Sequence, residues 1–318
     1  MPTDSLFDPP PEPDAALGDV VATFREADPR GERTGKVLRM TYDQLYDGQR
    51  TGRFRWDQLF KTEKTHYGTL IEINLRREFD DVIDDGELLD YRIAGHEIDC
   101  KYSQTDGGWM LPPECFGQLL LVCTASDQRS EWSLGVVRAS DAHRRTSSNR
   151  DSKTSLNSAG RAAVDWLHRN SQLPPNVLLR IDPKVVRKIF SLKSGQRRVN
   201  ELFRSAQNTR IGRNAVATVA QQDDYMKRVR SNGGARSALA WEGILIAGGD
   251  YEAHRNVAAD FGATVPGPGE FVSFTVLPTQ ATDPKAVALD GTHWRLARQG
   301  EIGTDYAPSL PSTKRPIS

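Results

Sequence analysis

The sequence predicts an α/β protein of two domains, in which a mixed sheet surrounded by helices precedes short basic helices and a β-ribbon. The chain has 318 residues, and a single hydrophobic core rarely grows beyond about 250–300 residues. A polar segment with two prolines, residues 171–177, divides the chain. Charge changes there too. Residues 180–240 contain 14 Lys and Arg but only 4 Asp and Glu, whereas the whole chain is neutral, as expected when only one domain meets a polyanion.

Hydrophobic periodicity predicts the elements of the first half. Apolar residues at helical spacing indicate helices over residues 17–30, 36–46, 54–61, 66–79 and 157–170. Alternating or continuous apolar runs indicate strands over residues 88–94, 97–103, 118–126 and 132–140. The run at 118–126, QLLLVCTAS, is apolar on both faces, as a central buried strand should be. We therefore expect a small mixed sheet with helices packed around it.

The second half consists of shorter elements. Helices are predicted over residues 183–190, 195–206, 212–221, 223–231 and 251–262, and Asp182-Pro183 is an N-cap and N1 pair that opens the first of them. Strands are predicted over residues 243–248 and 271–278, with a strand pair within 286–298. Short helices followed by a β-ribbon are the order of a winged helix-turn-helix module. We place a disordered leader at 1–16, domains at 17–170 and 178–305, the linker at 171–177, and a disordered tail at 306–318.

Several sequence features indicate the cellular compartment and exclude some classes of protein. No run of 18 apolar residues is present, so we expect no transmembrane helix and no membrane partner. The N-terminus, MPTDSLFDPPPEPDAA, lacks the basic and apolar regions of a secretory signal. Cys100, Cys115 and Cys123 are odd in number and have no CxxC spacing, which argues against a disulfide framework and a structural zinc site. We expect a cytoplasmic protein whose cysteines are small buried residues.

Ionisable residues gather in the predicted hairpin. Side chains alternate faces along a strand, so Asp99 and Lys101 share a face. A turn at Ala94-Gly95 would put Asp90 opposite Asp99, and a turn at Gly95-His96 would put it opposite Lys101. Both registers leave Asp90 on the same face as the other two residues, whereas a slip of one residue would not.

Two carboxylates and an ammonium on one face suit a metal site better than a core. Like charges directly opposite destabilise a sheet, and Mg²⁺ takes one or two carboxylates together with waters and a phosphate oxygen. Lys101 could then steady the attacking water and the charge that develops at phosphorus. Glu72, on the preceding helix and off its apolar stripe, could add a carboxylate. Asp…(Asp/Glu)-x-Lys is the pattern of restriction-type nucleases. From the spacing alone, a solvated strand edge with alternating charges is the alternative interpretation.

Longer blocks of sequence are more specific. They are DQLYDGQRTGR (43–53), WDQL with KTEKTH (56–66), EINLRREF (72–79), IDCKYS (98–103), WMLPPE (109–114), RVNELFR (198–204), ATVAQQDDYMKRVR (217–230) and GGARS (233–237). With these blocks the chain resembles the NaeI family of type IIE restriction endonucleases along nearly its whole length. The resemblance implies a restriction-endonuclease-like PD-(D/E)xK domain at 17–170. It also implies a winged helix-turn-helix domain at 178–305, similar to that of the catabolite activator protein.

The resemblance also implies an activity and its partners. It assigns Glu72, Asp90, Asp99 and Lys101 to catalysis, with the three carboxylates as ligands of Mg²⁺. It implies a homodimer that cuts both strands of DNA at a GC-rich palindrome, GCCGGC. Such enzymes bind two copies of double-stranded DNA, one as substrate and one as allosteric effector.

Residues 210–230 mix Arg, Asn, Gln and Asp with few bulky apolar residues. Arg pairs with guanine, Asn and Gln pair with adenine, and Asp accepts from cytosine, so a GC-rich site favours Arg and Asp as base readers. A solvated basic face is the alternative for any single residue. We expect DNA contacts from Arg197, Arg198, Arg210, Arg213, Asn214, Gln221, Gln222, Asp223, Asp224, Lys227, Arg228, Arg230 and Arg236.

Two other functions stay open. One is a DNA-binding regulator with a decayed nuclease domain, against which the intact acids and lysine argue. The other is a strand-nicking or strand-passing enzyme, because residues 45–48, LYDG, are similar to the Lys-x-Asp-Gly motif of DNA ligases. Leu45 stands where ligases have the nucleophilic lysine, so ligase chemistry is not available. The simplest interpretation of this segment is a helix that ends in an Asp-Gly turn; a loop that contacts the DNA backbone is the alternative.

Overall fold

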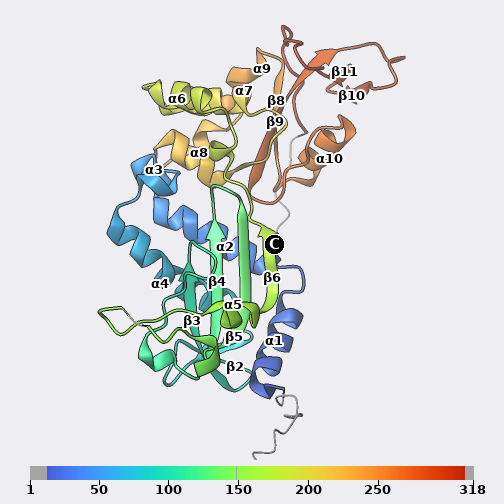
Figure 1. Ribbon diagram of the computed structural model, residues 1–318. Coiled ribbons are helices and arrows are strands. Elements are labelled where there is room, and N and C mark those ends of the chain that lie inside the picture. The colour runs from blue at the N-terminus through green and yellow to red at the C-terminus, as the bar shows by residue number, and fades with distance from the viewer. Residues whose placement is uncertain (1–12, 148, 312–318) are drawn as a thin grey trace, which may run out of the picture. The chain divides into compact units, whose positions relative to one another are not determined.

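The computed structural model describes residues 13–147 and 149–311 (Figure 1). The chain forms two compact units. Among the described residues, the first unit contains those up to Tyr42 and those within Phe60–Pro174, and the second contains Asp43–Leu59 and those from Pro175 onward. The break after residue 174 falls inside the predicted linker. The sequence did not predict that the segment 43–59 packs with the second unit.

The first unit is built on a six-stranded sheet in the order β1-β2-β3-β4-β5-β6. Its strands are β1 (Ile83–Asp85), β2 (Tyr91–Ile93), β3 (His96–Ser103), β4 (Leu119–Ser126), β5 (Glu131–Arg138) and β6 (Asp165–Gln172). β3 and β4 pair in parallel, and the other neighbours are antiparallel. The sheet is therefore mixed, as predicted, and β4 is buried along its whole length.

The helices of this unit are α1 (Ala15–Ala27), α2 (Glu32–Tyr46, whose last four residues belong to the second unit), α4 (Lys61–Glu78) and α5 (Ser158–Ala162). The Asp14 side chain caps α1 by accepting from the Leu17 N–H at 3.1 Å. In α4 the Glu63 carboxylate accepts from the Phe60 N–H at 2.8 Å, which satisfies a donor at the helix start. Short 3-10 turns lie at Pro113–Cys115 and Asp141–His143. Among the residues that the structure describes, no helix is both long enough and apolar enough to cross a membrane.

The hairpin register is the first of the two alternatives considered. β2 and β3 pair Tyr91 with Ile98 and Ile93 with His96, so Asp90 stands across from Asp99. Ala94 and Gly95 form the turn, with φ of 50° and 80°. Positive φ at both central residues is what a two-residue type I′ turn requires. This tight turn fixes the register on which the acidic cluster depends.

The predicted helix over 157–170 is wrong for most of its length. Only Ser158–Ala162 is helical, and Asp165–Gln172 is β6, which pairs with β5. Trp166 lies 6.3 Å from the Trp109 ring, and His168 lies 5.2 Å from the Trp132 ring. The backbone of β5 needs partners along its outer edge, and this tertiary pairing overrides the local helical pattern.

The second unit has a five-stranded antiparallel sheet with the path β10-β11-β9-β7, and β8 also pairs with β9. The strands are β7 (Ile211–Gly212), β8 (Ile244–Gly248), β9 (Glu270–Pro278), β10 (Val287–Leu289) and β11 (Thr292–Leu296). The helices are α3 (Gly48–Thr51), α6 (Pro183–Ser191), α7 (Gly195–Ser205), α8 (Arg213–Ala220), α9 (Ala235–Ala240) and α10 (Glu252–Asp260). Predicted helices at 54–61 and 223–231 are only 3-10 turns, Trp56–Gln58 and Tyr225–Arg228, and a further turn is Val177–Leu179.

The segment 43–59 completes the core of the second unit. Phe54 is buried with Val199, Leu202 and Phe203, and its ring stacks on Phe190 with centroids 5.6 Å apart. At Gly48 a Cβ would lie 2.1 Å from the Thr218 hydroxyl, so no larger residue fits. The segment Leu45–Gly48 is thus a helix end and turn that packs on α8, in agreement with its simplest interpretation.

The end of the chain differs from the expectation of a disordered tail from residue 306. The Ala307 N–H donates to the Ala240 carbonyl at 2.8 Å, and Ala307 is buried. The Tyr306 ring meets Trp241 edge-on at 4.8 Å. Residues 306–311 are therefore packed on the second unit. The remaining tail, 312–318, and residues 1–12 of the predicted leader lie outside the described residues, while α1 begins inside that predicted leader.

Candidate active site

Two carboxylates face each other across the hairpin of the first unit. Asp90 directly precedes β2, and Asp99 lies on β3 and is buried. The Cys100 N–H donates to Asp90 Oδ2 at 2.8 Å, and the two carboxyl groups lie close enough for each to shift the pKa of the other. The structure therefore brings together the two acids that strand alternation placed on one face.

The two acids differ in how readily they ionise. Burial, with the hydrogen bond to Asp99 and its charge, raises the pKa of Asp90 to about 7. Burial also acts to raise the pKa of Asp99, but hydrogen bonds from Asp90, Cys115 and Lys101 outweigh it and hold that pKa below its ordinary value. Like charges this close do not both ionise readily. A bound cation would stabilise the doubly ionised pair.

Lys101 completes the cluster from the same face of β3. Its ammonium forms an ion pair with Asp99 Oδ2, and Nζ also donates to the Cys100 carbonyl at 3.3 Å. Burial acts to lower the pKa of Lys101, but the hydrogen bond and charge of Asp99 more than offset it, so the pKa is raised. The cluster therefore holds an ammonium whose charge is stabilised beside two acids.

Glu72 approaches this cluster from α4. The Tyr91 hydroxyl donates to the Glu72 backbone carbonyl at 2.6 Å and fixes this turn of α4 against β2. The pKa of Glu72 is raised, mainly by burial, with Lys101 opposing and Asp99 adding to the shift. Within residues 13–147 and 149–311, no group of three or more His, Cys, Asp or Glu is arranged to hold a metal ion. Asp90 and Asp99 are thus a pair of oxygen donors, a set that suits Mg²⁺, which takes one or two carboxylates with waters and a phosphate oxygen.

Glu97 is a functional candidate that the sequence reasoning missed. Its carboxylate accepts from the backbone N–H groups of Glu87, Leu88 and Leu89 at 3.0, 3.2 and 3.0 Å. These amides, with the guanidinium of Arg92, hold the pKa of Glu97 at about 2. The loop that carries Asp90 into place is wrapped around this side chain. Glu97 lies two residues before Asp99 and four before Lys101 on β3, so strand alternation puts it on their face, a signal that could have revealed it.

If the acidic cluster binds a metal and cuts DNA, as the resemblance implies, replacing Glu97 with alanine should lower the rate of DNA cleavage by about 10–100-fold, the usual cost of removing a group that supports a metal ligand. The loop would lose the anion around which its amides converge, and Asp90 would shift. The unfolding temperature should change little because the loop amides can turn to water. Glu87→Gln, at an exposed residue that pairs with Arg92, is the matched control. Equal cleavage rates for the two variants would show that Glu97 does not position Asp90.

The predicted DNA-contacting residues are spread over the second unit. Seven of them are exposed: Arg197, Arg210, Arg213, Gln221, Asp223, Lys227 and Arg230. Asn214, Gln222, Asp224 and Arg228 are half-buried. Asp224 pairs with Arg228 at 2.9 Å and with Lys227 at 3.6 Å, so these charges partly neutralise one another.

Arg198 and Arg236 are bound to backbone carbonyls of their own unit. The Arg198 guanidinium donates to the carbonyls of Val219 and Ala220 at 2.6 and 2.8 Å and to that of Leu192 at 3.1 Å. It therefore caps the C-terminal end of α8. Arg236 Nε donates to the Ile246 carbonyl at 2.9 Å. Both arginines have a structural role that the sequence did not indicate.

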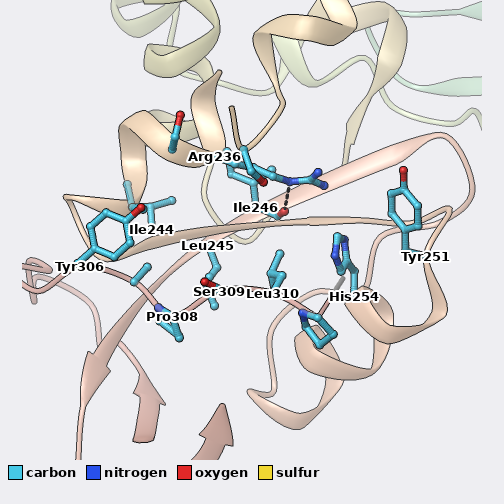
Figure 2. Close-up of a pocket in the computed structure, with 15 residues that line it drawn as sticks. Arg236, Ile244, Leu245, Ile246, Tyr251, His254, Tyr306, Pro308, Ser309 and Leu310 are labelled. Atoms are coloured by element: carbon cyan, nitrogen blue, oxygen red, sulfur yellow. Dashed lines mark hydrogen bonds between the residues drawn. The ribbon is translucent and has the colours of Figure 1, made fainter. Parts of the chain in front are cut away.

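Arg236 also lines a cavity of about 340 Å³ in the second unit (Figure 2). The other walls come from β8, α10 and residues 306–311. In Figure 2 His254 and Tyr251 stand on one side of Leu310, and Tyr306 lies at the far end. His254 Nδ1 accepts from the Gly248 N–H at 3.2 Å. A ring nitrogen that accepts carries no proton, so this contact belongs to the neutral imidazole.

Stability of the second unit should fall as pH drops from about 6.5 to 4. Burial, with the positive charge of Arg236, lowers the pKa of His254 from 6.5 to about 4. The neutral ring therefore stabilises the fold above the unfolded-state pKa, and this contribution, about 3 kcal/mol, is lost as pH falls from there through the folded-state pKa. Urea unfolding at a series of pH values should show a steeper loss in the wild type than in His254→Asn. His66→Asn, at an exposed histidine, should keep the wild-type slope, and a wild-type slope in His254→Asn would contradict the assignment.

Comparisons with known proteins point to one family. The sequence model of the family described as restriction endonuclease NaeI matches residues 18–305. The type II restriction enzyme NaeI of Lentzea aerocolonigenes is 50% identical to this chain over 308 residues, which cover 94% of this chain and 96% of that enzyme. Both matches span the two units and include the acidic cluster. The chain therefore belongs to the NaeI family of restriction endonucleases and is a type II site-specific deoxyribonuclease.

Proposed function

We propose that the protein is a Mg²⁺-dependent, type IIE-like restriction endonuclease that cuts both strands of DNA at a GC-rich palindrome, GCCGGC. The observation that carries the proposal is the convergence of Asp90, Asp99 and Lys101 in one partly buried cluster. The mixed sheet around this cluster supports a PD-(D/E)xK nuclease domain. Membership of the NaeI family supports the same reaction class.

Each residue of the cluster has a distinct proposed role. Asp90 and Asp99 would hold Mg²⁺ through carboxylate oxygens, and Glu72 would add negative charge or hold a metal-bound water. Bound Mg²⁺ would supply Lewis-acid polarisation of the phosphate and a more acidic water. Lys101 would steady the attacking water and the charge that develops at phosphorus, because its ammonium stays charged and is held in place by Asp99. The 5′-phosphate would remain on the product.

The second unit would bind DNA as a winged helix-turn-helix module. Short helices α6 to α8 and the β10–β11 ribbon support this proposal, as does the excess of ten positive charges over residues 180–240. Arg197 and Arg230 are the strongest candidates for phosphate contact because they are exposed. A homodimer would bind two DNA copies, one as substrate and one as effector.

A plasmid digest tests the proposal. Plasmids with one or two GCCGGC sites are incubated with the protein in Mg²⁺ or in EDTA, and the ends are sequenced. Linear product in Mg²⁺ only, with faster cutting of the two-site plasmid, is the expected result. Added duplex oligonucleotide that carries the site should accelerate cutting of the one-site plasmid. Nicked circles would favour a nicking enzyme, relaxed circles a strand-passing enzyme, and binding without any cutting a regulator.

A further inference from the structure

Cys115 contributes an unexpected contact to the acidic cluster. The sequence indicated only a small buried residue. In the structure its thiol donates to Asp99 Oδ2, with the sulfur 2.6 Å from the oxygen. Cys115 is fully buried, so water does not compete for this hydrogen bond. Thiols are weak donors in water, but a bond to a charged carboxylate in a buried site is stronger.

The chain brings Cys115 to this position by a long connection. β3 and β4 are parallel, so the residues between them must cross from one end of the sheet to the other. Trp109 anchors this crossing by donating from Nε1 to the Cys123 carbonyl at 2.9 Å. The 3-10 turn Pro113–Cys115 then places the thiol just before β4. Because Leu120 near the start of β4 pairs with Asp99 on β3, the thiol lies beside Asp99.

We propose that Cys115 is a positioning residue for the cleavage reaction: its thiol holds Asp99 in the rotamer that directs Oδ1 toward Asp90 and the Mg²⁺ that the pair would bind. The inference rests on the proposed function. Cys115 and Lys101 both contact Oδ2, so this oxygen is held from two sides. In the proposed arrangement the other oxygen, Oδ1, faces Asp90 and the cation. Without the thiol, Lys101 alone would fix the carboxylate, and its flexible side chain fixes a rotamer poorly.

Another buried thiol provides a matched control. Cys123 lies on β4, is fully buried, and its raised pKa has burial as its one cause. Removing its sulfur leaves a cavity similar to that left at Cys115, but does not touch Asp99. A comparison of Cys115→Ala with Cys123→Ala therefore separates the loss of the donor from the loss of packing.

Binding of MgCl₂ to the full-length, DNA-free protein is measured by isothermal titration calorimetry, and cleavage rates are measured over a Mg²⁺ series. We expect Cys115→Ala to weaken Mg²⁺ binding and to raise the Mg²⁺ needed for half-maximal cleavage by about tenfold or more. Cys123→Ala should match the wild type in both. Cys115→Ser, which keeps a donor, should recover most of the affinity that alanine loses. Cys115→Val, which fills the space without a donor, repeats the comparison if the alanine variant does not fold.

Equal Mg²⁺ affinities for the Cys115→Ala and Cys123→Ala proteins would overturn the inference. Failure of Cys115→Ser to recover affinity relative to alanine would also overturn it, since any donor at this position should serve. The wild type reports separately on the proposed function. If it neither binds Mg²⁺ nor cuts DNA in its presence, the nuclease proposal itself fails. If it does both and the variants behave alike, only the role of Cys115 is lost.

Discussion

Asp99→Ala and Lys101→Ala should each lower the rate of DNA cleavage by about 10²–10³-fold, the usual cost of removing one group that stabilises charge in a transition state. Removal of Asp99 takes away one carboxylate of the pair and the partner of the Lys101 ammonium. Removal of Lys101 leaves the acids without their fixed positive charge. Affinity for DNA should be retained, because the proposed DNA contacts of the second unit are unchanged.

Single-turnover cleavage of a one-site duplex, together with gel-shift binding in Ca²⁺, separates the two effects. Asp85→Ala and Lys153→Ala are matched controls, since both side chains are exposed on the first unit. They should cut like the wild type. Full Mg²⁺-dependent cutting by either Asp99→Ala or Lys101→Ala would remove the site assignment.

Trp109→Ala should lower the free energy of unfolding of the first unit by about 3–5 kcal/mol, the range for loss of a buried aromatic side chain. Trp109 is fully buried in a cluster with Leu111, Leu120 and Val122. Its indole N–H also satisfies the Cys123 carbonyl, so the variant loses a hydrogen bond as well as packing.

Urea unfolding followed by circular dichroism measures this effect. Trp241→Ala is the matched control because Trp241 is 73% exposed, and its loss should change the midpoint little. Trp109→Phe should fall between the two, since it keeps most of the ring volume but leaves the Cys123 carbonyl without its donor. Identical midpoints for Trp109→Ala and Trp241→Ala would contradict the assigned burial.

The acidic cluster could be predicted because its geometry is local. Alternation along β3 and a tight turn at Ala94-Gly95 determine which side chains of one hairpin meet. The thiol of Cys115 could not be predicted, because it reaches Asp99 through the connection between two parallel strands. Glu97 could have been found, since its spacing on β3 places it on the same face as Asp99 and Lys101. Its partners could not, because they are backbone N–H groups of a loop that has no regular periodicity.

The secondary structure was likewise predictable where it depends on neighbouring residues and not where it depends on contacts distant in sequence. Most helices and strands were predicted because periodicity and end signals such as Asp182-Pro183 act over a few residues. β6 was mistaken for helix because its conformation is set by the open edge of β5. The place of Phe54 in the second core depends on Phe190, which is far away in sequence.

The segment 43–59, which the second unit takes from the first half of the chain, determines how this enzyme can be divided into fragments. Because residues 43–59 lie within the first half of the sequence but belong to the second unit, a cut at residues 171–177 does not yield two self-sufficient pieces. A fragment that starts at Pro175 would expose the face of Phe190 that Phe54 covers. A fragment that ends at Pro174 would carry Phe54 as an apolar side chain without its core. Mixing the two fragments should therefore restore order that neither has alone.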